Sequence, residues 1–148
     1  MEERGLKLSD EKTVITNIND GFDFLGWNFR KFKGKLLIQP SRKSKQKVTK
    51  SLSRTIKYYH EANQELLIIK LNQITRGWAE YHHCACAKKT YALIDHRLWE
   101  MLWKWAKRRH PRKGKKWIKN RYWHPKVLRS ILFDTVICRI RKIKISHF

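Results

Sequence analysis

Acidic residues are scarce in this sequence. Only 12 Asp and Glu stand against 35 Lys and Arg, which gives a formal net charge of +23. A charge of this size repels itself in a compact chain and favours binding to a polyanion. Nucleic acid is the first candidate partner, and an anionic membrane surface is the second.

Long apolar runs are also missing. The sequence has no stretch of about 18 apolar residues, which excludes a membrane-spanning helix. The first residues, MEERGLKLSDEK, are charged and lack the apolar core of a signal peptide. Three cysteines without a secretion signal indicate free thiols in a reducing compartment. We therefore expect no membrane partner and a location in the cytoplasm, or in the equivalent matrix of an organelle.

The residues that polymerase or nuclease chemistry needs are absent as a group. Two-metal phosphoryl transfer requires carboxylates that converge on one site. Adjacent acidic residues occur only near the start of the chain. Other acids are scattered along it, among them Asp20, Asp23, Asp95, Glu100 and Asp134. The sequence also has no glycine-rich loop that would cradle a phosphate. We therefore predict no catalytic residues and no cofactor.

One cluster has metal-ligating side chains. His82, His83, Cys84 and Cys86 lie in one short stretch, and the remaining cysteine is Cys138. Zinc sites are usually built from two separated ligand pairs, and no second pair is present. A Cys–His nucleophile pair would lack a third group to orient it. We interpret the stretch as a loop between helices and predict no metal.

The apolar residues predict a helical core. With 148 residues and 41% apolar residues, the chain has the size of one domain, or of one domain with an appendage. Apolar residues recur four, three, four and three positions apart, which predicts a central helix over 64–83: Leu67, Leu71, Ile74, Trp78 and Tyr81. Gly77 inside this helix costs about 1 kcal/mol relative to alanine. We therefore expect another group to approach closely at Gly77.

Two further long helices flank the central one. Residues 44–60 carry one apolar face, Val48, Leu52, Ile56 and Tyr59, and residues 88–108 carry another, Tyr91, Ile94, Leu98, Leu102 and Trp105. Asn63 or a neighbour is the expected cap of the central helix, and Pro111 ends the third. Trp99 and Trp103 widen the third helix's face, so we expect cover on two sides. Residues 115–122 are expected to form a short helix.

The N-terminal part predicts strands. Residues 22–39 are rich in aromatic and apolar residues and contain the turn Lys33-Gly34-Lys35, which predicts a β-hairpin. Strands are also expected at 13–18 and, from alternating Ile and basic residues, at 137–145. The predicted fold is mainly α, with an N-terminal β-hairpin, a three-helix domain and a basic C-terminal segment. The expected boundaries are 1–40, 41–110 and 111–148.

The positive charge is clustered. Residues 24–60 hold 11 Lys and Arg and no acid, residues 101–133 hold 12 and no acid, and the middle is close to balanced. Soluble proteins normally intersperse both signs, so the two runs predict a polyanion site. RNA fits better than a membrane because Trp117, Tyr122 and Trp123 lie among the cations and could stack on unpaired bases. Ordinary packing of these aromatics is the alternative.

The candidate RNA-binding residues are cations of these runs, together with Arg76 beside Gly77. Packing of the helices decides whether they form one surface or two. The candidates are Lys31, Lys33, Lys35, Arg42, Lys43, Lys47, Lys50, Arg54, Arg76, Lys104, Lys107, Arg108, Arg109, Arg112, Lys113, Lys115, Lys116 and Lys119.

Several stretches resemble group II intron-encoded reverse transcriptase/maturases over about residues 5–123. GLKLSDEKTVITNINDGFDFLGWNFRKFKGKLLIQPS resembles the end of their palm and the last reverse-transcriptase block. LNQITRGWAEY and LIDHRLWEMLWKWAKRRHP resemble the maturase-specific thumb, called domain X. The resemblance implies a palm end at 1–40 and thumb helices at 41–110 that grip intron RNA, assisting splicing and mobility.

The sequence also departs from that family. The sequence lacks the paired carboxylates of the family's palm and the Cys pairs of its HNH-type endonuclease, and residues 133–148 match no part of the family. Lys12 does match a palm position near the nucleotide site, but the rest of that site is absent. The resemblance implies a C-terminal piece that binds intron RNA, with DNA as a further partner of its basic C-terminal segment. It has no polymerase site of its own.

Two other interpretations remain open. One is half of a split reverse transcriptase that completes an active site with a separately encoded palm, and the other is the inert product of a degraded reading frame. The apolar face of GFDFLGW discriminates the split enzyme, because a bare face implies a palm partner and a face covered by the chain's own helices does not.

Overall fold

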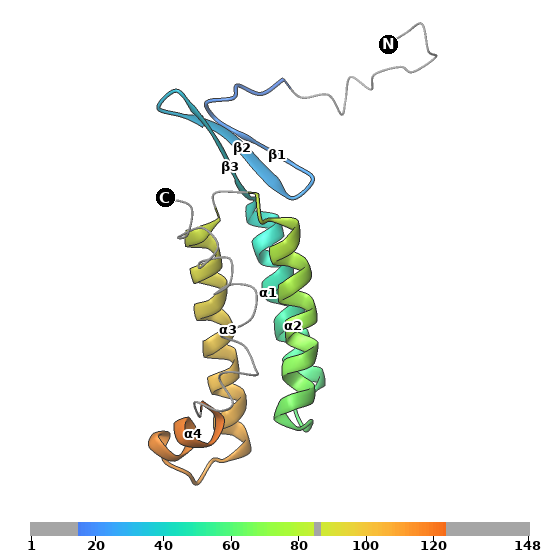
Figure 1. Ribbon diagram of the computed structural model, residues 1–148, viewed down its shortest axis with the longest axis vertical. Coiled ribbons are helices and arrows are strands. Elements are labelled where there is room, and N and C mark those ends of the chain that lie inside the picture. The colour runs from blue at the N-terminus through green and yellow to red at the C-terminus, as the bar shows by residue number, and fades with distance from the viewer. Residues whose placement is uncertain (1–14, 85–86, 124–148) are drawn as a thin grey trace, which may run out of the picture.

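Three short strands come first and four helices follow. The computed structural model describes residues 15–84 and 87–123. The elements are β1 (Phe22–Phe24), β2 (Trp27–Phe32), β3 (Lys35–Pro40), α1 (Arg42–Tyr58), α2 (Gln64–Tyr81), α3 (Lys88–Arg109) and α4 (Lys115–Tyr122). The sheet lies at one end of an elongated helical bundle and α4 at the other (Figure 1). The expected mainly α fold with an N-terminal hairpin is confirmed.

The sheet has one strand more than the expected hairpin. Its order is β1-β2-β3, all antiparallel, and Phe29 of β2 pairs with Phe22 on one side and Ile38 on the other. Both turns have positive φ at their two central residues, Leu25–Gly26 and Lys33–Gly34, as type I′ turns require. The first turn is hard to predict because Leu25 is a residue that seldom adopts positive φ.

One predicted strand is wrong where it can be compared. Residues 15–17 are irregular and 18–20 form a turn, so the part of the 13–18 prediction that lies within the described residues is not a strand. Asn17 organises this turn, because its carbonyl accepts hydrogen bonds from the amides of Asp20 and Gly21. The strand predicted at 137–145 lies outside the described residues.

Side-chain caps set the starts of the first two helices. The Ser41 hydroxyl accepts a hydrogen bond from the Ser44 amide at 3.1 Å, so α1 begins two residues before the predicted start. Asn63 caps α2 as predicted, and its side chain accepts from the Leu66 amide at 2.9 Å. The predicted helix at 115–122 is confirmed as α4.

The core lies between the three long helices. α1 leads away from the sheet, α2 returns to it and α3 leads away again, so α1 and α3 run parallel (Figure 1). Leu52 of α1, Leu67 and Leu71 of α2 and Ile94 of α3 are almost fully buried in one cluster. Ile118 attaches α4 to the same cluster.

The central helix differs from its prediction at two positions. Gly77 is exposed, and a Cβ placed on it would meet nothing within 4 Å, so the expected close approach is not made by any described residue. Tyr81 is 52% exposed because α2 ends there, at the junction with the sheet. The buried side of α2 instead includes Thr75 and Ala79.

Two apolar surfaces stay partly open within the described part of the chain. Phe22, Phe24 and Leu36 share one face of the sheet and are 40%, 58% and 58% exposed. On α3, Trp99 stacks on Trp103, and Trp123 lies against both rings, yet Trp99 remains 40% exposed. This face of the sheet is therefore only partly covered by the described residues, although Trp27 on the same face packs against Tyr81 and His82.

Candidate nucleic-acid interface

The outer side of α1 carries a continuous row of cations. Lys43, Lys47, Lys50, Arg54 and Lys57 follow one another at spacings of four, three, four and three, opposite the buried face of the helix. All five are exposed, and α1 contains no acid. We call these five residues the α1 stripe. Lys57 was missing from the sequence candidates, although continuing the same spacing past Arg54 finds it.

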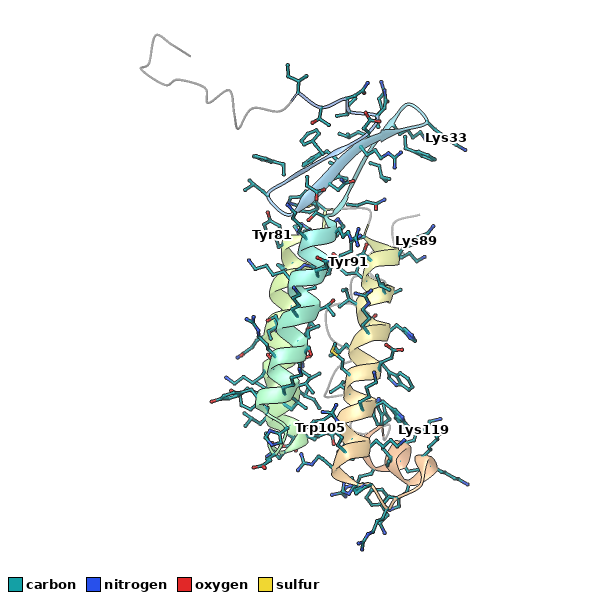
Figure 2. The ribbon with its side chains drawn as sticks, turned by 180° about the vertical axis from the view of Figure 1, so that it is seen from behind. Lys33, Tyr81, Lys89, Tyr91, Trp105 and Lys119 are labelled. Carbon is teal, nitrogen blue, oxygen red and sulfur yellow. The ribbon has the colours of Figure 1, made fainter. Side chains whose placement is uncertain are left out.

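The cations of the two basic runs, residues 24–60 and 101–133, are spread along the bundle. α1 follows the last strand directly, so its start lies near the sheet. α3 runs parallel to α1, so Lys104 to Arg109 at the end of α3 lie at the end of the bundle farthest from the sheet (Figure 1). Lys33 lies on the sheet, and Lys119 lies on α4 at the other end of the helical bundle (Figure 2). The α1 stripe runs the length of α1, and Lys57 at its end lines a groove together with Lys104 and Arg108 of α3.

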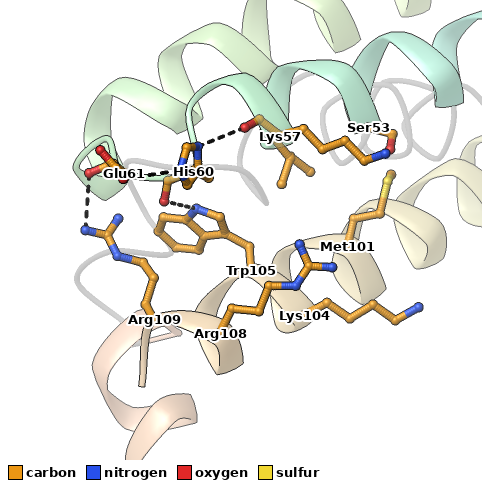
Figure 3. A pocket seen from close by; sticks show the side chains of 10 residues that line it. Ser53, Lys57, His60, Glu61, Met101, Lys104, Trp105, Arg108 and Arg109 are labelled. Carbon is orange, nitrogen blue, oxygen red and sulfur yellow. Dashed lines mark hydrogen bonds and ion pairs between the residues drawn. The ribbon is translucent and has the colours of Figure 1, made fainter. Parts of the chain in front are cut away.

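A groove lies where the stripe meets α3. It encloses about 660 Å³ and is lined by α1, the α1–α2 loop and α3 (Figure 3). Lys57 of α1 and Lys104 and Arg108 of α3 contribute three cations to it. Its apolar lining comes from Ile56, Met101 and Trp105. The one acid in the lining is Glu61, whose carboxylate lies 3.3 Å from His60 Nε2.

The Arg109 side chain lines this groove but is bonded to the chain's own backbone. Its guanidinium donates hydrogen bonds to the backbone carbonyls of Ala62 and Glu61 and lies 4.9 Å from the Trp105 ring. The Trp105 indole N–H in turn donates to the His60 carbonyl at 3.2 Å. Arg109 therefore holds the α1–α2 loop against the end of α3, whereas Arg108 has no such bond among the described residues.

The cations around α4 form the far end of the basic surface. Arg112, Lys113, Lys115, Lys116 and Lys119 are all exposed. Lys113 Nζ lies 5.5 Å from the ring of Trp117, which is 41% exposed.

The three aromatics proposed to stack on bases are not equivalent. Tyr122 and Trp123 pack on the core, and the Tyr122 hydroxyl lies 2.8 Å from His110 Nε2. Packing accounts for these two rings, so Trp117 is the ring that is most open to a ligand.

The remaining candidates lie apart from the α1 stripe. Lys31, Lys33 and Lys35 are exposed on the sheet, and Lys33 Nζ lies 5.7 Å from the Phe32 ring. Arg76 is exposed on α2, two positions after Ile74, so it lies on the side of that helix that faces away from α1. Lys107 and Arg42 are exposed at the end of α3 and the start of α1.

In the stretch considered as a metal site, His82 instead helps to join α2 to α1. His82 is fully buried, and its Nε2 lies 2.9 Å from the Ser44 hydroxyl, which accepts the indole N–H of Trp78 at 3.0 Å. The Ser44 hydroxyl therefore bridges the side chains of Trp78 and His82. Burial lowers the pKa of His82. Within the described residues, no group of three or more His, Cys, Asp or Glu side chains is placed to hold a metal ion.

Tyr91 of α3 bonds to the end of α2, where His82 lies. Its hydroxyl donates to the carbonyls of His82 at 2.9 Å and Ala79 at 3.3 Å. Burial, with smaller contributions from Cys84 and Glu80, raises the pKa of Tyr91 to about 12. This residue therefore stays a neutral hydrogen-bond donor that secures the end of α2.

One family of known proteins matches the helical part of this chain. None of the described helices combines the length and apolar character that crossing a bilayer requires. No curated protein sequence matches the chain. Residues 42–123 match the family described as group II intron, maturase-specific domain. This match covers α1 to α4 and more than half of the sequence, and the chain therefore belongs to the group II intron maturase-specific domain family.

Proposed function

We propose that this chain binds group II intron RNA and thereby assists splicing and mobility, without a polymerase site of its own. Membership of the family supports the maturase role, and an intron RNA is the partner that a maturase domain implies in general. The observation that carries the proposal is the α1 stripe, which leads into the groove between α1 and α3. The proposed boundaries remain a palm end at 1–40, thumb helices at 41–110 and a basic segment from 111.

The physical reason is the placement of charge. Five exposed cations without an acid on the same helix form a surface about 21 Å long, at 1.5 Å per residue. Lys and Arg that neutralise phosphates release counterions, so binding weakens steeply as salt rises. Contacts of this kind position RNA without reading its sequence. The proposed mechanism is therefore binding that holds a particular RNA shape.

The test compares two double variants that remove the same charge. Lys50→Gln with Arg54→Gln neutralises the middle of the α1 stripe, and Lys88→Gln with Lys89→Gln neutralises two exposed cations at the start of α3. Affinity for group II intron RNA is measured by fluorescence anisotropy over a range of salt. We expect the first variant to lower the salt slope by roughly 1.4 to 1.8 units and the second to change it little.

Two outcomes would contradict the proposal. If the unaltered chain fails to bind intron RNA, the proposed function is wrong. Equal losses from the two double variants would mean that net charge alone drives binding, and the localised site would then be rejected. Circular dichroism melting of each variant checks that the substitutions leave the fold intact.

A second candidate is half of a split reverse transcriptase, completed by a separately encoded palm. The family match does not favour it over the first, but the partly exposed apolar face of Phe22, Phe24 and Leu36 supports a partner on the sheet. Phe24→Lys with Leu36→Lys would then abolish co-sedimentation with a palm fragment. Lys33→Gln, at the turn, would not. DNA binding by the C-terminal basic segment and a cytoplasmic location are also proposed.

A further inference from the structure

A second groove lies on the opposite flank of the α1 stripe, between α1 and α2. It encloses about 530 Å³ and lies under the β1–β2 turn. Its lining includes Lys47 and Ser51 of α1 and Ile74, Trp78 and Tyr81 of α2. Tyr81 lies where the helices meet the sheet (Figure 2). Its volume falls within the range of about 300–1,000 Å³ that is usual for small-molecule sites.

Small residues keep this groove open. Ser44 and Ser51 occupy the flank of α1 that faces α2, where larger side chains would fill the space. At the upper end, the Tyr81 hydroxyl donates to the Leu25 carbonyl at 2.6 Å, and the Tyr81 ring lies 5.5 Å from that of Trp27. The turn and α2 therefore hold an aromatic side chain in place on the groove wall without any ligand.

The lining combines three features that suit a nucleobase. Ile74, Trp78 and Tyr81 supply apolar and aromatic surface, on which any base can stack. The Ser51 hydroxyl makes no hydrogen bond to another described residue, so it is available to a polar base edge. Lys47 belongs to the α1 stripe and is exposed at the groove, where a phosphate attached to the base would lie.

Charge favours a nucleotide over a protein side chain as the occupant. No acidic residue is among those that line this groove; Lys47 is the lining cation, and Lys43 and Lys50 are its neighbours in the α1 stripe. An unpaired base that leaves a helix carries its phosphates to that edge, and such splayed bases are the usual targets of specific RNA recognition. We propose that the groove between α1 and α2 holds one unpaired base of an RNA whose backbone lies on the α1 stripe. This inference rests on the proposed function.

The experiment uses two RNA hairpins that differ by one nucleotide. One stem carries a single bulged fluorescent purine analogue, and the other is fully paired. The chain should bind the bulged hairpin roughly 5- to 150-fold more tightly, the range expected from stacking one base. The fluorescence of the bulged base should fall on binding because the base stacks on aromatic side chains.

Two matched variants identify the groove. Ser51→Phe fills the groove between α1 and α2, while Ser53→Phe places the same ring in the other groove, between α1 and α3. Both serines are half-buried on one helix. Ser51→Phe should abolish the preference for the bulged hairpin and the fluorescence change, but keep salt-dependent binding to the paired stem. Ser53→Phe should keep the preference.

The outcomes separate this inference from the proposed function. Binding to neither hairpin would reject both. Equal, salt-dependent binding of the two hairpins by the unaltered chain would reject the base site and leave the RNA-binding function standing. Loss of the preference in Ser53→Phe alone would also overturn the inference, because the base would then occupy the other groove. The comparison of hairpins with the unaltered chain does not depend on the folding of either variant.

Discussion

At the scale of single residues, neighbours in the sequence have separate tasks. Arg108 and Arg109 were both expected to bind RNA, but only Arg108 faces the groove without a bond to the chain's own backbone in the described part. Arg109 instead joins α3 to the α1–α2 loop. A charge run in a sequence shows that cations are present, but it does not show which of them fold back on carbonyl groups.

This difference predicts opposite effects of the same substitution. Arg109→Gln removes hydrogen bonds to two carbonyls and a contact with the Trp105 ring, so unfolding should become easier by about 1 kcal/mol. Its effect on the salt slope should be small. Arg108→Gln should lower the salt slope of RNA binding by roughly 0.7 to 0.9 units and leave stability nearly unchanged. Thermal melting and salt titration measure the two effects, and the reverse pattern would show that the roles are exchanged.

His82 makes the junction between sheet and helices sensitive to pH. Burial lowers its pKa from the usual 6.5, so the unfolded chain takes up a proton more readily than the folded chain. The stabilising difference is present above pH 6.5 and is lost as pH falls below 6.5 towards the lowered pKa. One such group contributes a slope of at most about 1.4 kcal/mol per pH unit.

We therefore expect the free energy of unfolding to fall as pH drops below 6.5. His82→Gln should flatten that fall, although it also removes the hydrogen bond between Nε2 and Ser44. His96→Gln is the matched control, because His96 is largely exposed and pairs with Glu100, one turn away. Denaturant unfolding at several pH values measures the slopes. Equal slopes in His82→Gln and the unaltered chain would show that another group causes the pH dependence.

At the scale of elements, the helices follow from the sequence and the sheet follows in part. Apolar spacing places Leu52, Leu67, Leu71 and Ile94 in the core, and the Asn63 cap and Pro111 limit their helices. The β1–β2 turn is not predicted because it needs positive φ at Leu25. The α1–α3 groove and the burial of His82 depend on how helices pack, which a period of 3.6 residues does not reveal.

At Gly77 in α2, the expected close approach of another group is not found among the described residues. A glycine inside a helix costs about 1 kcal/mol relative to alanine, and nothing in the described part of the chain lies within 4 Å of the Cβ that alanine would add. Gly77→Ala should therefore stabilise the chain by about 0.5–1 kcal/mol. Ala79→Gly, in the same helix but at a fully buried position, should destabilise it.

The RNA affinity of the Gly77→Ala variant tests whether this glycine contributes to the interface. If Gly77→Ala stabilises the fold and leaves RNA binding unchanged, the glycine has no part in the interface. A destabilised Gly77→Ala variant would show that the outer side of α2 is not open, contrary to the structure. Chemical denaturation of the two variants under identical conditions provides the comparison.

At the scale of the whole molecule, the chain presents a basic helical bundle and an apolar sheet that extends beyond it. The cations reach from Lys33 at one end to Lys119 at the other (Figure 2). The sheet leaves Phe24 and Leu36 more than half exposed within the described residues. We propose that the bundle holds a polyanion and that the exposed apolar side chains of the sheet contact an apolar partner. Among the described residues, no group of acidic side chains is placed to hold a metal ion.

That arrangement predicts that the chain alone does not polymerise DNA. Metal-dependent nucleotide transfer needs carboxylates that hold two metal ions about 4 Å apart. Adjacent acids occur in the sequence only at Glu2–Glu3 and Asp10–Glu11, and no metal-holding group is found among the described residues. Purified chain with an RNA template, a DNA primer and Mg²⁺ should incorporate no nucleotide above background, whereas an added reverse transcriptase should do so in the same mixture. Template-dependent incorporation that co-purifies with the chain and is lost on substituting one of its own acidic residues would contradict a role limited to binding.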